Sequence, residues 1–393
     1  MNAASVELAA TAGDKNNGEN PASGGVPHRL YLPQKTMKAI IQDRYGSPDD
    51  LELREIATPV PAKGEVLVRV QAAAIHVGDC FGVRGTPLLM RVETGLLKPK
   101  YGVPGYDCAG RVEAVGEGVT RFRIGDEVFG VCSGACAEFV CTSEGKLALK
   151  PSEITFEQAA AVPTSGLAAL HALRDVAKIQ SGQKVLIIGA SGGVGTFAVQ
   201  IAKSLGAEVA GVCSATNIDQ VRSIGADHVI DYTRENFADG GPRYDLIFDN
   251  VENRSLSDCR RALKPTGTLV LNSGTGARGF AFLSRLLKPL LISPFVSQRL
   301  CRYLSTPNSA DLNVLAEMLK SAAVTPVIGR TYPLVETADA IRYVETGHAK
   351  GKRSSVLEME DEEESNRQRP AEIAVCKSPG RERRSTVAAA IGI

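Results

Sequence analysis

The feature that most constrains this fold is a glycine-rich turn between an apolar strand and a helix. The run Lys184-Val-Leu-Ile-Ile188 predicts a buried strand. Four glycines fill the turn and the start of the helix that follows it: Gly189, Gly192, Gly193 and Gly195. The helix is expected to reach about Ser204, where Gly206 can end it. Strand, glycine turn and helix in this order predict the opening of a βαβ unit.

Apolar strands alternate with helices along the rest of this region. The capping-box spacing of Thr155-Phe-Glu-Gln158 predicts that a helix begins there, before the first of these strands. The predicted strands are 185–188, 208–213, 228–231, 245–249 and 268–271. Continuous apolar strands separated by helices predict an α/β fold, with a parallel sheet covered on both faces.

The glycine turn indicates a dinucleotide site. Its glycines allow a tight turn, close approach of a pyrophosphate and close helix–sheet packing. The free N–H groups and dipole of the helix start favour a phosphate. The predicted contacts are Gly189, Ser191, Gly192, Gly193, Val194 and Gly195. A purely structural turn is the alternative interpretation.

The end of the next strand bears on which nicotinamide cofactor is bound. An acidic residue would hold the ribose 2′-hydroxyl of NAD, and none occurs before Asp219. The predicted contacts there are Ser214, Thr216 and Asn217, small side chains that leave room for the 2′-phosphate of NADPH. Arg222 and Arg234 are either neutralising cations or ordinary surface charges.

Short alternating strands dominate residues 37 to about 155. Val66, Val68 and Val70 fall on one strand face, and Gly and Pro recur at short intervals. This pattern predicts an all-β, barrel-like unit. After residue 323, a short strand, a helix at 336–345 and a last strand at 355–359 are expected.

Composition excludes several classes of protein. The 393 residues predict two domains, and a net charge of +1 gives no electrostatic argument for nucleic acid. No run is long and apolar enough for a membrane span, and the N-terminus lacks the pattern of a secretory signal. Nine cysteines, an odd number, favour a reducing compartment over a disulfide framework. A cytoplasmic protein is predicted, with a mitochondrial presequence as the disfavoured alternative.

A series of ordered motifs resembles the medium-chain dehydrogenase/reductase superfamily, specifically its zinc-free quinone-oxidoreductase-like branch. The motifs are Met37-Lys-Ala-Ile40, Pro61-Ala-Lys-Gly-Glu-Val-Leu-Val68, Gly105-Tyr-Asp-Cys-Ala-Gly110, Gly125-Asp-Glu-Val-Phe-Gly130, Ala159-Ala-Ala-Val-Pro163, Gly192-Gly-Val-Gly195, Gly225-Ala-Asp-His-Val-Ile-Asp-Tyr232 and Gly347-His-Ala-Lys-Gly-Lys352. The resemblance implies a GroES-like catalytic domain interrupted by a Rossmann domain, cofactor contact by Tyr232, and a homodimer. The expected parts are a disordered leader 1–36, the first catalytic part 37–160, the NAD(P)-binding domain 161–322, the return to the catalytic domain 323–359, and a disordered charged tail 360–393.

The pattern of metal ligands in zinc-dependent members is broken in this chain. It has His76, then Gly105-Tyr106-Asp107, then Ala161, and only His76 of these suits zinc, which needs three protein ligands in a catalytic site. No zinc is therefore predicted. We interpret Cys132, Cys136 and Cys141 as buried free thiols.

Without a metal, the resemblance implies NADPH-dependent hydride transfer to quinones or other α,β-unsaturated carbonyls. The candidate catalytic residues are His76, Asp79 and Tyr106. Alternatives stay open: His76 as a structural histidine, Tyr106 as packing, and Asp79 with Asp107 as carboxylates that brace the backbone. Pro87 stands where acyl-thioester reductases of this branch have a tyrosine, which disfavours such substrates.

Two other functions remain as alternatives: an NADP-dependent alcohol or aldehyde dehydrogenase, and a nucleotide-binding structural or interaction protein with little turnover. A small-molecule substrate is expected for the reductase and for the dehydrogenase alike.

The stretch from Phe280 to Leu304 is unusually apolar for a connection. Core packing is the favoured interpretation, with a cap on the substrate cleft, a dimer interface or a membrane contact as alternatives.

Overall fold

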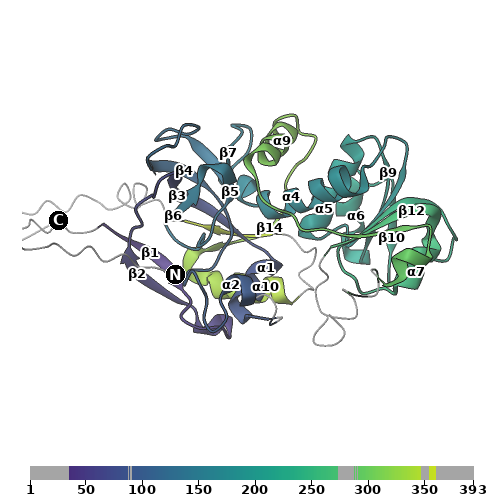
Figure 1. Cartoon of the computed structure of the whole chain (residues 1–393), viewed down its shortest axis with the longest axis horizontal. Coiled ribbons are helices and arrows are strands. Elements are labelled where there is room, and N and C mark those ends of the chain that lie inside the picture. The colour runs from purple at the N-terminus through teal and green to yellow at the C-terminus, as the bar shows by residue number, and fades with distance from the viewer. Residues whose placement is uncertain are drawn as a thin grey trace, which may run out of the picture. The chain divides into compact units, whose positions relative to one another are not determined.

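The computed structural model describes residues 35–86, 88, 91–272, 287, 289, 291–346 and 354–359. The predicted tail, and the predicted leader apart from its last residues, lie outside these ranges. The first described strand begins at Thr36. The described chain contains two large sheets and one two-stranded sheet, and Figure 1 labels strands of all three.

One sheet has six strands, and every pair in it is parallel. Its order is β10-β9-β8-β11-β12-β13, which is the doubly wound order of a dinucleotide-binding fold. The strands are β8 Lys184–Ile188, β9 Glu208–Cys213, β10 His228–Asp231, β11 Tyr244–Asp249, β12 Leu263–Leu271 and β13 Arg299–Arg302. The predicted α/β class and parallel sheet are confirmed.

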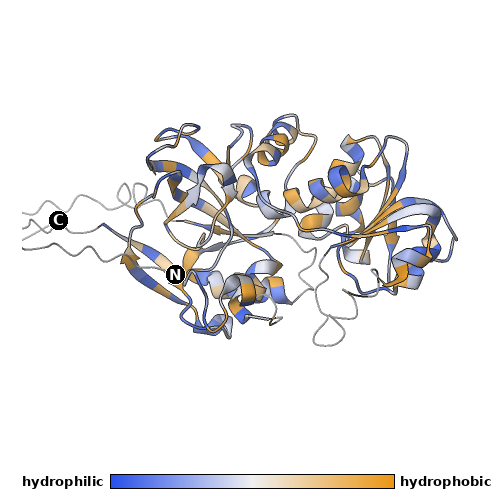
Figure 2. Ribbon diagram, in the orientation of Figure 1, coloured by the Kyte–Doolittle hydropathy of each residue, from blue (hydrophilic) through white to orange (hydrophobic). Residues whose placement is uncertain are grey.

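Both faces of this sheet are buried. Val185 and Ile187 join a core with Phe197 of the following helix, whereas Leu186 and Ile188 point to the other face. Alternate residues of one strand therefore fill two different cores, which explains why the strand is apolar throughout. Figure 2 shows the apolar strands between more polar helix surfaces.

Two predicted helix ends in this region are confirmed: a helix begins after Thr155, and the helix after the glycine turn ends at Ser204. Thr155 forms the predicted capping box with Gln158. The helical segments are α3 Phe156–Ala160, α4 Pro163–Leu170, the π-helical η4 His171–Ala177, α5 Gly193–Ser204, η5 Ala215–Asn217, α6 Ile218–Ser223, α7 Leu256–Ala262, η6 Ser293–Phe295 and α9 Ser309–Lys320.

The second sheet has seven strands. They are β3 Glu65–Ile75, β4 Asp107–Val115, β5 Glu127–Val131, β6 Phe139–Ser143, β7 Leu147–Leu149, β14 Ile328–Pro333 and β15 Ser354–Glu358. A separate pair is formed by β1 Thr36–Ile41 and β2 Glu52–Ala57. The late strand β15 lies between β14 and β3, so residues far apart in sequence complete one sheet. The exact domain boundaries stay predictions.

The prediction of an all-β unit before residue 155 is wrong in part. This region contains η1 Pro48–Asp50, α1 Val77–Arg84, α2 Arg91–Thr94 and η3 Glu144–Lys146, and after it η7 Leu334–Glu336 and α10 Thr337–Glu345. Helix α1 has glycines at 78 and 82, which disfavour a helix by intrinsic propensity. Its contacts with α10 override that preference.

The segment Phe280–Leu304 also departs from its interpretation. Where it is described, Leu291, Phe295 and Leu304 are exposed, so core packing is wrong for them. Strand β13, which was not predicted, ends the segment and pairs with β12. No helix among the described residues is long and apolar enough to cross a membrane.

Candidate active site

The turn after β8 has the geometry that its glycines predict. Gly189 has φ +79°, and a Cβ there would lie 2.6 Å from Val251 Cγ2. A Cβ on Gly195 would lie 2.0 Å from the Gly189 carbonyl oxygen. Only glycine therefore allows α5 to begin so close to the end of β8.

The first turn of α5 can accept an anion. Its N-cap is Gly192, which offers no side chain to bind the N–H groups of the first turn. Those amides have no partner within the helix. Ser191, Gly193 and Val194 lie in the same turn, so the six predicted contacts from 189 to 195 are brought together. Together with the helix dipole, this turn suits a pyrophosphate.

A second group of predicted contacts lies at the end of β9. Asn217 Nδ2 donates to Ser214 Oγ at 2.8 Å, and the hydroxyls of Ser214 and Thr216 are 3.1 Å apart. The Tyr232 amide, just after β10, donates to the Cys213 carbonyl at 3.1 Å. All four predicted residues therefore gather where β9 and β10 end.

Charges near this group were only partly anticipated. Arg254 Nη2 donates to the Tyr232 carbonyl at 3.3 Å, although its place in the sequence gave no indication of this. Asp231 is buried at the end of β10, and hydrogen bonds from Thr233 hold the pKa of its carboxyl below its usual range. Arg234 Nε lies 3.8 Å from Asp231. One buried carboxylate and at least two cations thus border the site.

Arg222, the other cation considered for the 2′-phosphate, forms an ion pair on the protein surface. Its Nη1 lies 3.5 Å from Asp219 Oδ1 on the surface of α6, and both side chains are exposed. This ion pair is consistent with the alternative interpretation of Arg222 as a surface charge.

An ion pair missed by sequence analysis lies beyond the ends of β11 and β13. Arg302 Nη1 donates to Glu252 Oε1 at 2.9 Å, and Nη2 donates to Oε2 at 2.5 Å. Glu252 is buried with φ +52°, a conformation uncommon outside glycine. Glu252 follows Val251, the residue that packs against Gly189, so the pair fixes the backbone beside the nucleotide turn.

His76 caps the N-terminus of α1. Its Nδ1 accepts a hydrogen bond from the Gly78 amide at 3.0 Å, and Asp79 Oδ2 accepts one from the His76 amide at 2.7 Å. A Cβ on Gly78 would lie 2.7 Å from the imidazole, so glycine leaves room for the ring. Because Nδ1 is an acceptor, the ring is the neutral tautomer with its proton on Nε2.

The other side of this imidazole is unpaired. His76 Nε2 is buried and, among the described residues, has no hydrogen-bond partner. Asp79 Oδ2 lies 3.4 Å from Nδ1, and the ring of Tyr106 stacks on the imidazole with centroids 6.0 Å apart and planes 19° apart. The three predicted catalytic residues are therefore brought together. A buried donor without an acceptor is costly unless a ligand supplies one.

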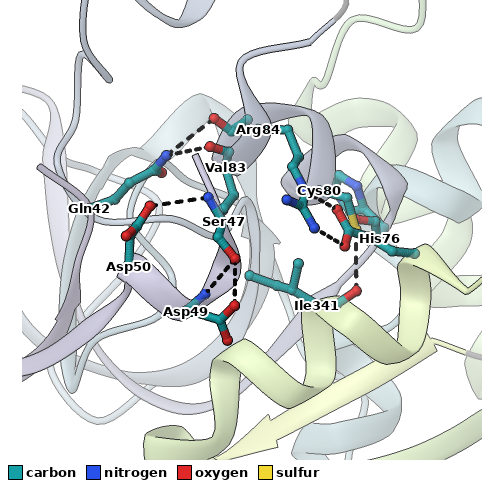
Figure 3. Close-up of polar contacts among 11 residues, drawn as sticks. Gln42, Ser47, Asp49, Asp50, His76, Cys80, Val83, Arg84 and Ile341 are labelled. Atoms are coloured by element: carbon teal, nitrogen blue, oxygen red, sulfur yellow. Dashed lines mark hydrogen bonds and ion pairs between the residues drawn. The ribbon is translucent and has the colours of Figure 1, made fainter. Parts of the chain in front are cut away.

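Helix α1 is held by Gln42 on one side and by α10 on another, and Figure 3 shows the labelled side chains of this region. Gln42 Nε2 donates to the Val83 carbonyl at 2.9 Å, and Cys80 Sγ contacts the carbonyl oxygens of His76 and Ile341 at 3.7 and 3.8 Å. Arg84 forms a bidentate pair with Glu345 of α10, with both N–O distances 2.7 Å. The contacts of Val83 and Arg84 fix the end of α1, and those of Cys80 fix its middle.

Asp107 connects the two halves of the candidate site. Its carboxylate accepts hydrogen bonds from the Thr164 amide at 2.9 Å and the Thr164 hydroxyl at 2.6 Å. It therefore joins β4 to the start of α4, which packs against α5. Burial raises the pKa of Asp107 to about 6, despite the opposing effects of His76 and Thr164. Burial also raises the pKa of Asp79.

A small cavity of about 30 Å³ adjoins this cluster. Asp79 and Tyr106 line it, together with Gly82, Val83 and the segment 99–106. Two of the candidate catalytic residues thus border one hollow.

The cysteines are free within the described ranges. Cys132 and Cys136 are buried as predicted, whereas Cys141 is only half-buried. A hydrogen bond with Cys108 and burial raise the pKa of Cys132 well above its usual value. The described residues contain no group of three or more His, Cys, Asp or Glu side chains placed to hold a metal ion.

A doubly wound sheet of the dinucleotide-binding type interrupts a second, β-rich sheet in this chain. The buried polar cluster lies beside strands β3 and β4 of that second sheet, in α1 and just before β4. These features together are typical of nicotinamide-dependent dehydrogenases and reductases. Comparisons with known proteins agree. The family of the alcohol dehydrogenase GroES-like domain matches residues 62–172, and that of the zinc-binding dehydrogenases matches residues 224–353.

Several relatives match most of the chain. An NADPH-dependent alkenal/one oxidoreductase of Arabidopsis thaliana is 33% identical over 337 residues, covering 81% of this chain and 79% of the relative. A 2-methylene-furan-3-one reductase of Solanum lycopersicum is 32% identical over 342 residues, covering 82% and 79%. The solved quinone oxidoreductase of Coxiella burnetii superposes with a TM-score of 0.71 at 30% identity, covering 83% of this chain and all of that one.

The chain therefore belongs to the medium-chain dehydrogenase/reductase superfamily, in its quinone-oxidoreductase-like branch. It is an oxidoreductase with the fold of a nicotinamide-cofactor enzyme.

Proposed function

We propose that this protein reduces quinones or other α,β-unsaturated carbonyls with NADPH and without zinc. The observation that carries the proposal is the buried His76 Nε2, a donor without a partner among the described residues. It lies beside Asp79 and Tyr106, which line the cavity. The substrate classes are those named for the relatives.

NADPH, when bound, supplies a hydride. The chain's own residues then need only orient the electrophile, exclude water and stabilise the charge that develops on its oxygen. The N–H at His76 Nε2 is suited to donate a hydrogen bond to that oxygen. The Gly78 amide already occupies Nδ1, so a doubly protonated ring would bring two N–H groups together. We therefore assign His76 as a neutral hydrogen-bond donor, with solvent supplying the proton that completes the reduction.

The preference for NADPH over NADH rests on the group at the ends of β9 and β10. Small hydroxyl and amide side chains leave space there, and Arg234 and Arg254 supply positive charge. The buried Asp231 opposes a 2′-phosphate electrostatically, so the cations must outweigh it. A mycobacterial relative of 27% identity and TM-score 0.70 was solved in complex with NADPH.

Arg254→Gln tests this preference. We expect NADPH to bind about tenfold more weakly to the variant, the usual range for one hydrogen bond to a charged group, with NADH unchanged. Titration by fluorescence measures both dissociation constants. The control is Arg123→Gln, which removes an exposed cation in the connection between β4 and β5. Equal affinities of the wild type for NADPH and NADH would refute the NADPH preference.

Zinc independence, a cytoplasmic location and a homodimer are parts of this proposal that need their own tests. Elemental analysis with chelator treatment decides the first; about one metal per chain and loss of activity on chelation would contradict it. Some relatives are chloroplastic or mitochondrial by name, so imaging of a tagged chain is needed for the second. Light scattering decides the third.

The decisive experiment follows NADPH oxidation at 340 nm with quinones, enones and aldehydes. We expect turnover with quinones or enones. Turnover with aldehydes alone would instead establish an alcohol or aldehyde dehydrogenase. Tight NADPH binding with no turnover would indicate a nucleotide-binding structural or interaction protein.

A further inference from the structure

A short stretch that includes α2 and the residues on either side of it exposes an unusual amount of apolar surface. The exposed fractions are 69% for Leu88, 73% for Val92, 70% for Leu96, 93% for Leu97 and 52% for Tyr101. We call these five residues the apolar loop. Scattered exposed leucines are ordinary, but five large apolar side chains within fourteen residues mark an interaction site.

Positive charge accompanies the apolar loop. Lys98 and Lys100 are both exposed, and Lys100 Nζ lies 5.2 Å from the centre of the Tyr101 ring. Neither lysine forms an ion pair with a described carboxylate. Between residues 88 and 101 the sequence has three cations and one anion, Glu93. The apolar side chains thus lie among basic groups that complement an anionic surface.

We propose that the apolar loop docks on the surface of a membrane that contains anionic lipids. Leu96 and Leu97 would enter the boundary between head groups and acyl chains. Lys98 and Lys100 would keep their ammonium groups among the lipid phosphates while their stems follow the leucines. Tyrosine, with an apolar ring and a polar hydroxyl, is typical of this boundary.

The composition favours a lipid partner over a protein. Lysine is depleted in protein–protein interfaces, and leucine rarely contributes strongly to their affinity. Here leucine and lysine are adjacent and both exposed, whereas tryptophan is absent from the chain. A second copy of this chain would also bring like charges together across a symmetric contact.

The apolar loop also borders the cavity of the candidate active site. Tyr101 of the apolar loop lines that cavity, as do its neighbours in sequence Thr94, Pro99 and Lys100. Docking would therefore place the cavity close to the lipid phase. Loading of a lipid-soluble quinone from the membrane rests on the proposed function, but docking itself does not.

Sedimentation with lipid vesicles tests the proposal on the full chain. The vesicles contain either phosphatidylcholine alone or phosphatidylcholine with phosphatidylglycerol. We expect binding to the anionic vesicles that weakens with added salt. The double variant Leu96→Ser/Leu97→Ser should lose most of this binding. Lys98→Gln should bind anionic vesicles about fivefold more weakly, since one cation near the surface contributes about 1 kcal/mol.

Val60→Ser is the matched control, because Val60 is 80% exposed and lies outside the apolar loop. Thermal unfolding and NADPH affinity show that each variant is folded, since Leu96 and Leu97 line neither the cavity nor the nucleotide turn. Equal vesicle binding by the wild type and the double variant would overturn the proposal, as would no binding to either vesicle. A wild-type dimer that the double variant converts to monomer would assign the loop to a second copy instead. None of these outcomes depends on catalytic turnover.

Discussion

His76 combines a fixed ring, a defined tautomer and an unpaired Nε2. His76→Ala removes that donor, and we expect kcat to fall about 100-fold, as for the loss of one hydrogen bond to a developing oxyanion. The dissociation constant for NADPH should change little. Steady-state rates with the best quinone or enone, together with a cofactor titration, measure both.

The variant His76→Gln should be measured beside His76→Ala. The glutamine amide retains an N–H donor at about the same distance from the backbone as His76 Nε2. It should recover part of the lost rate, with little change in the dependence of kcat on pH. Wild-type turnover in His76→Ala would show that the histidine is only a helix cap.

A substitution of Gly195 tests whether the nucleotide turn binds the pyrophosphate. In Gly195→Ala the new methyl would lie 2.0 Å from the Gly189 carbonyl oxygen, so α5 must shift away from β8. We expect loss of NADPH binding and a free energy of unfolding lower by about 2 kcal/mol, within the range for overpacking. Calorimetry measures affinity and denaturant unfolding measures stability.

Gly145→Ala is the control for this change, since the nearest atom to a Cβ there is Ser143 Oγ at an ordinary 3.7 Å. If Gly195→Ala binds NADPH as tightly as the wild type, the turn does not hold the pyrophosphate.

Asp107 should make stability depend on pH. Burial raises its pKa to about 6 in the folded protein, above the ordinary value of 3.8. The folded state therefore holds the proton more tightly, and the free energy of unfolding falls as pH rises from about 4 to about 6. Asp107→Asn should remove roughly 2 kcal/mol of that fall, given about 1.4 kcal/mol per unit of pKa. Urea unfolding at several pH values gives the difference, and identical pH slopes would contradict it.

Among the elements, the contact of η4 with α9 depends on one carboxylate. Asp311 Oδ2 lies 2.9 Å from His171 Nε2, and Oδ1 lies 2.7 Å from Arg174 Nη2. Burial opposes ionisation, but hydrogen bonds from Asn308, His171 and Arg174 outweigh it and lower the pKa of Asp311 to about 2. Its stabilising contribution is therefore present above pH 4 and is lost as pH falls through about 2.

Asp311→Asn should lower the free energy of unfolding at pH 7 by about 2 kcal/mol, less than for a fully buried pair because Arg174 is partly exposed. Asp339→Asn, which removes an exposed partner of Arg342, should change it by less than about 1 kcal/mol. Equal effects in chemical unfolding would show that the contact does not hold the two elements together.

The elements that were predicted are those with strong local patterns. Strand β9 was predicted at its observed bounds because a strand buried on both faces is apolar throughout. Helix α1 was missed because its cap is a histidine and its interior contains glycine. Strand β13 was missed because arginines stand at both of its ends. Arg254 reaches Tyr232 only through folding, so no local pattern could assign it to the site.

For the whole molecule, the position of β15 makes a clear prediction about truncation. A chain that ends at Met359 retains every described strand, including the hydrogen bond from the Met359 amide to the Gln71 carbonyl at 3.2 Å. A chain that ends at Arg353 loses β15, which lies between β14 and β3. We expect cooperative unfolding close to that of the full chain for the first, and its loss for the second.

Circular dichroism melts of both truncated chains and the full chain measure this. Cooperative melting of the chain ending at Arg353, at the temperature of the full chain, would show that the sheet does not need its late strand.

The position of β15 also determines the order in which the two large sheets can form during translation. All six strands of the nucleotide sheet leave the ribosome before residues 354–358 do, so that sheet can close while the chain is still growing. The other sheet cannot be completed by then. Strand β6 covers residues 65–69 of β3, but residues 72–75 on the same edge have no strand beside them until β15 is made. An open strand edge invites pairing with other nascent chains. This part of β3 is therefore exposed to such pairing for as long as β15 is missing.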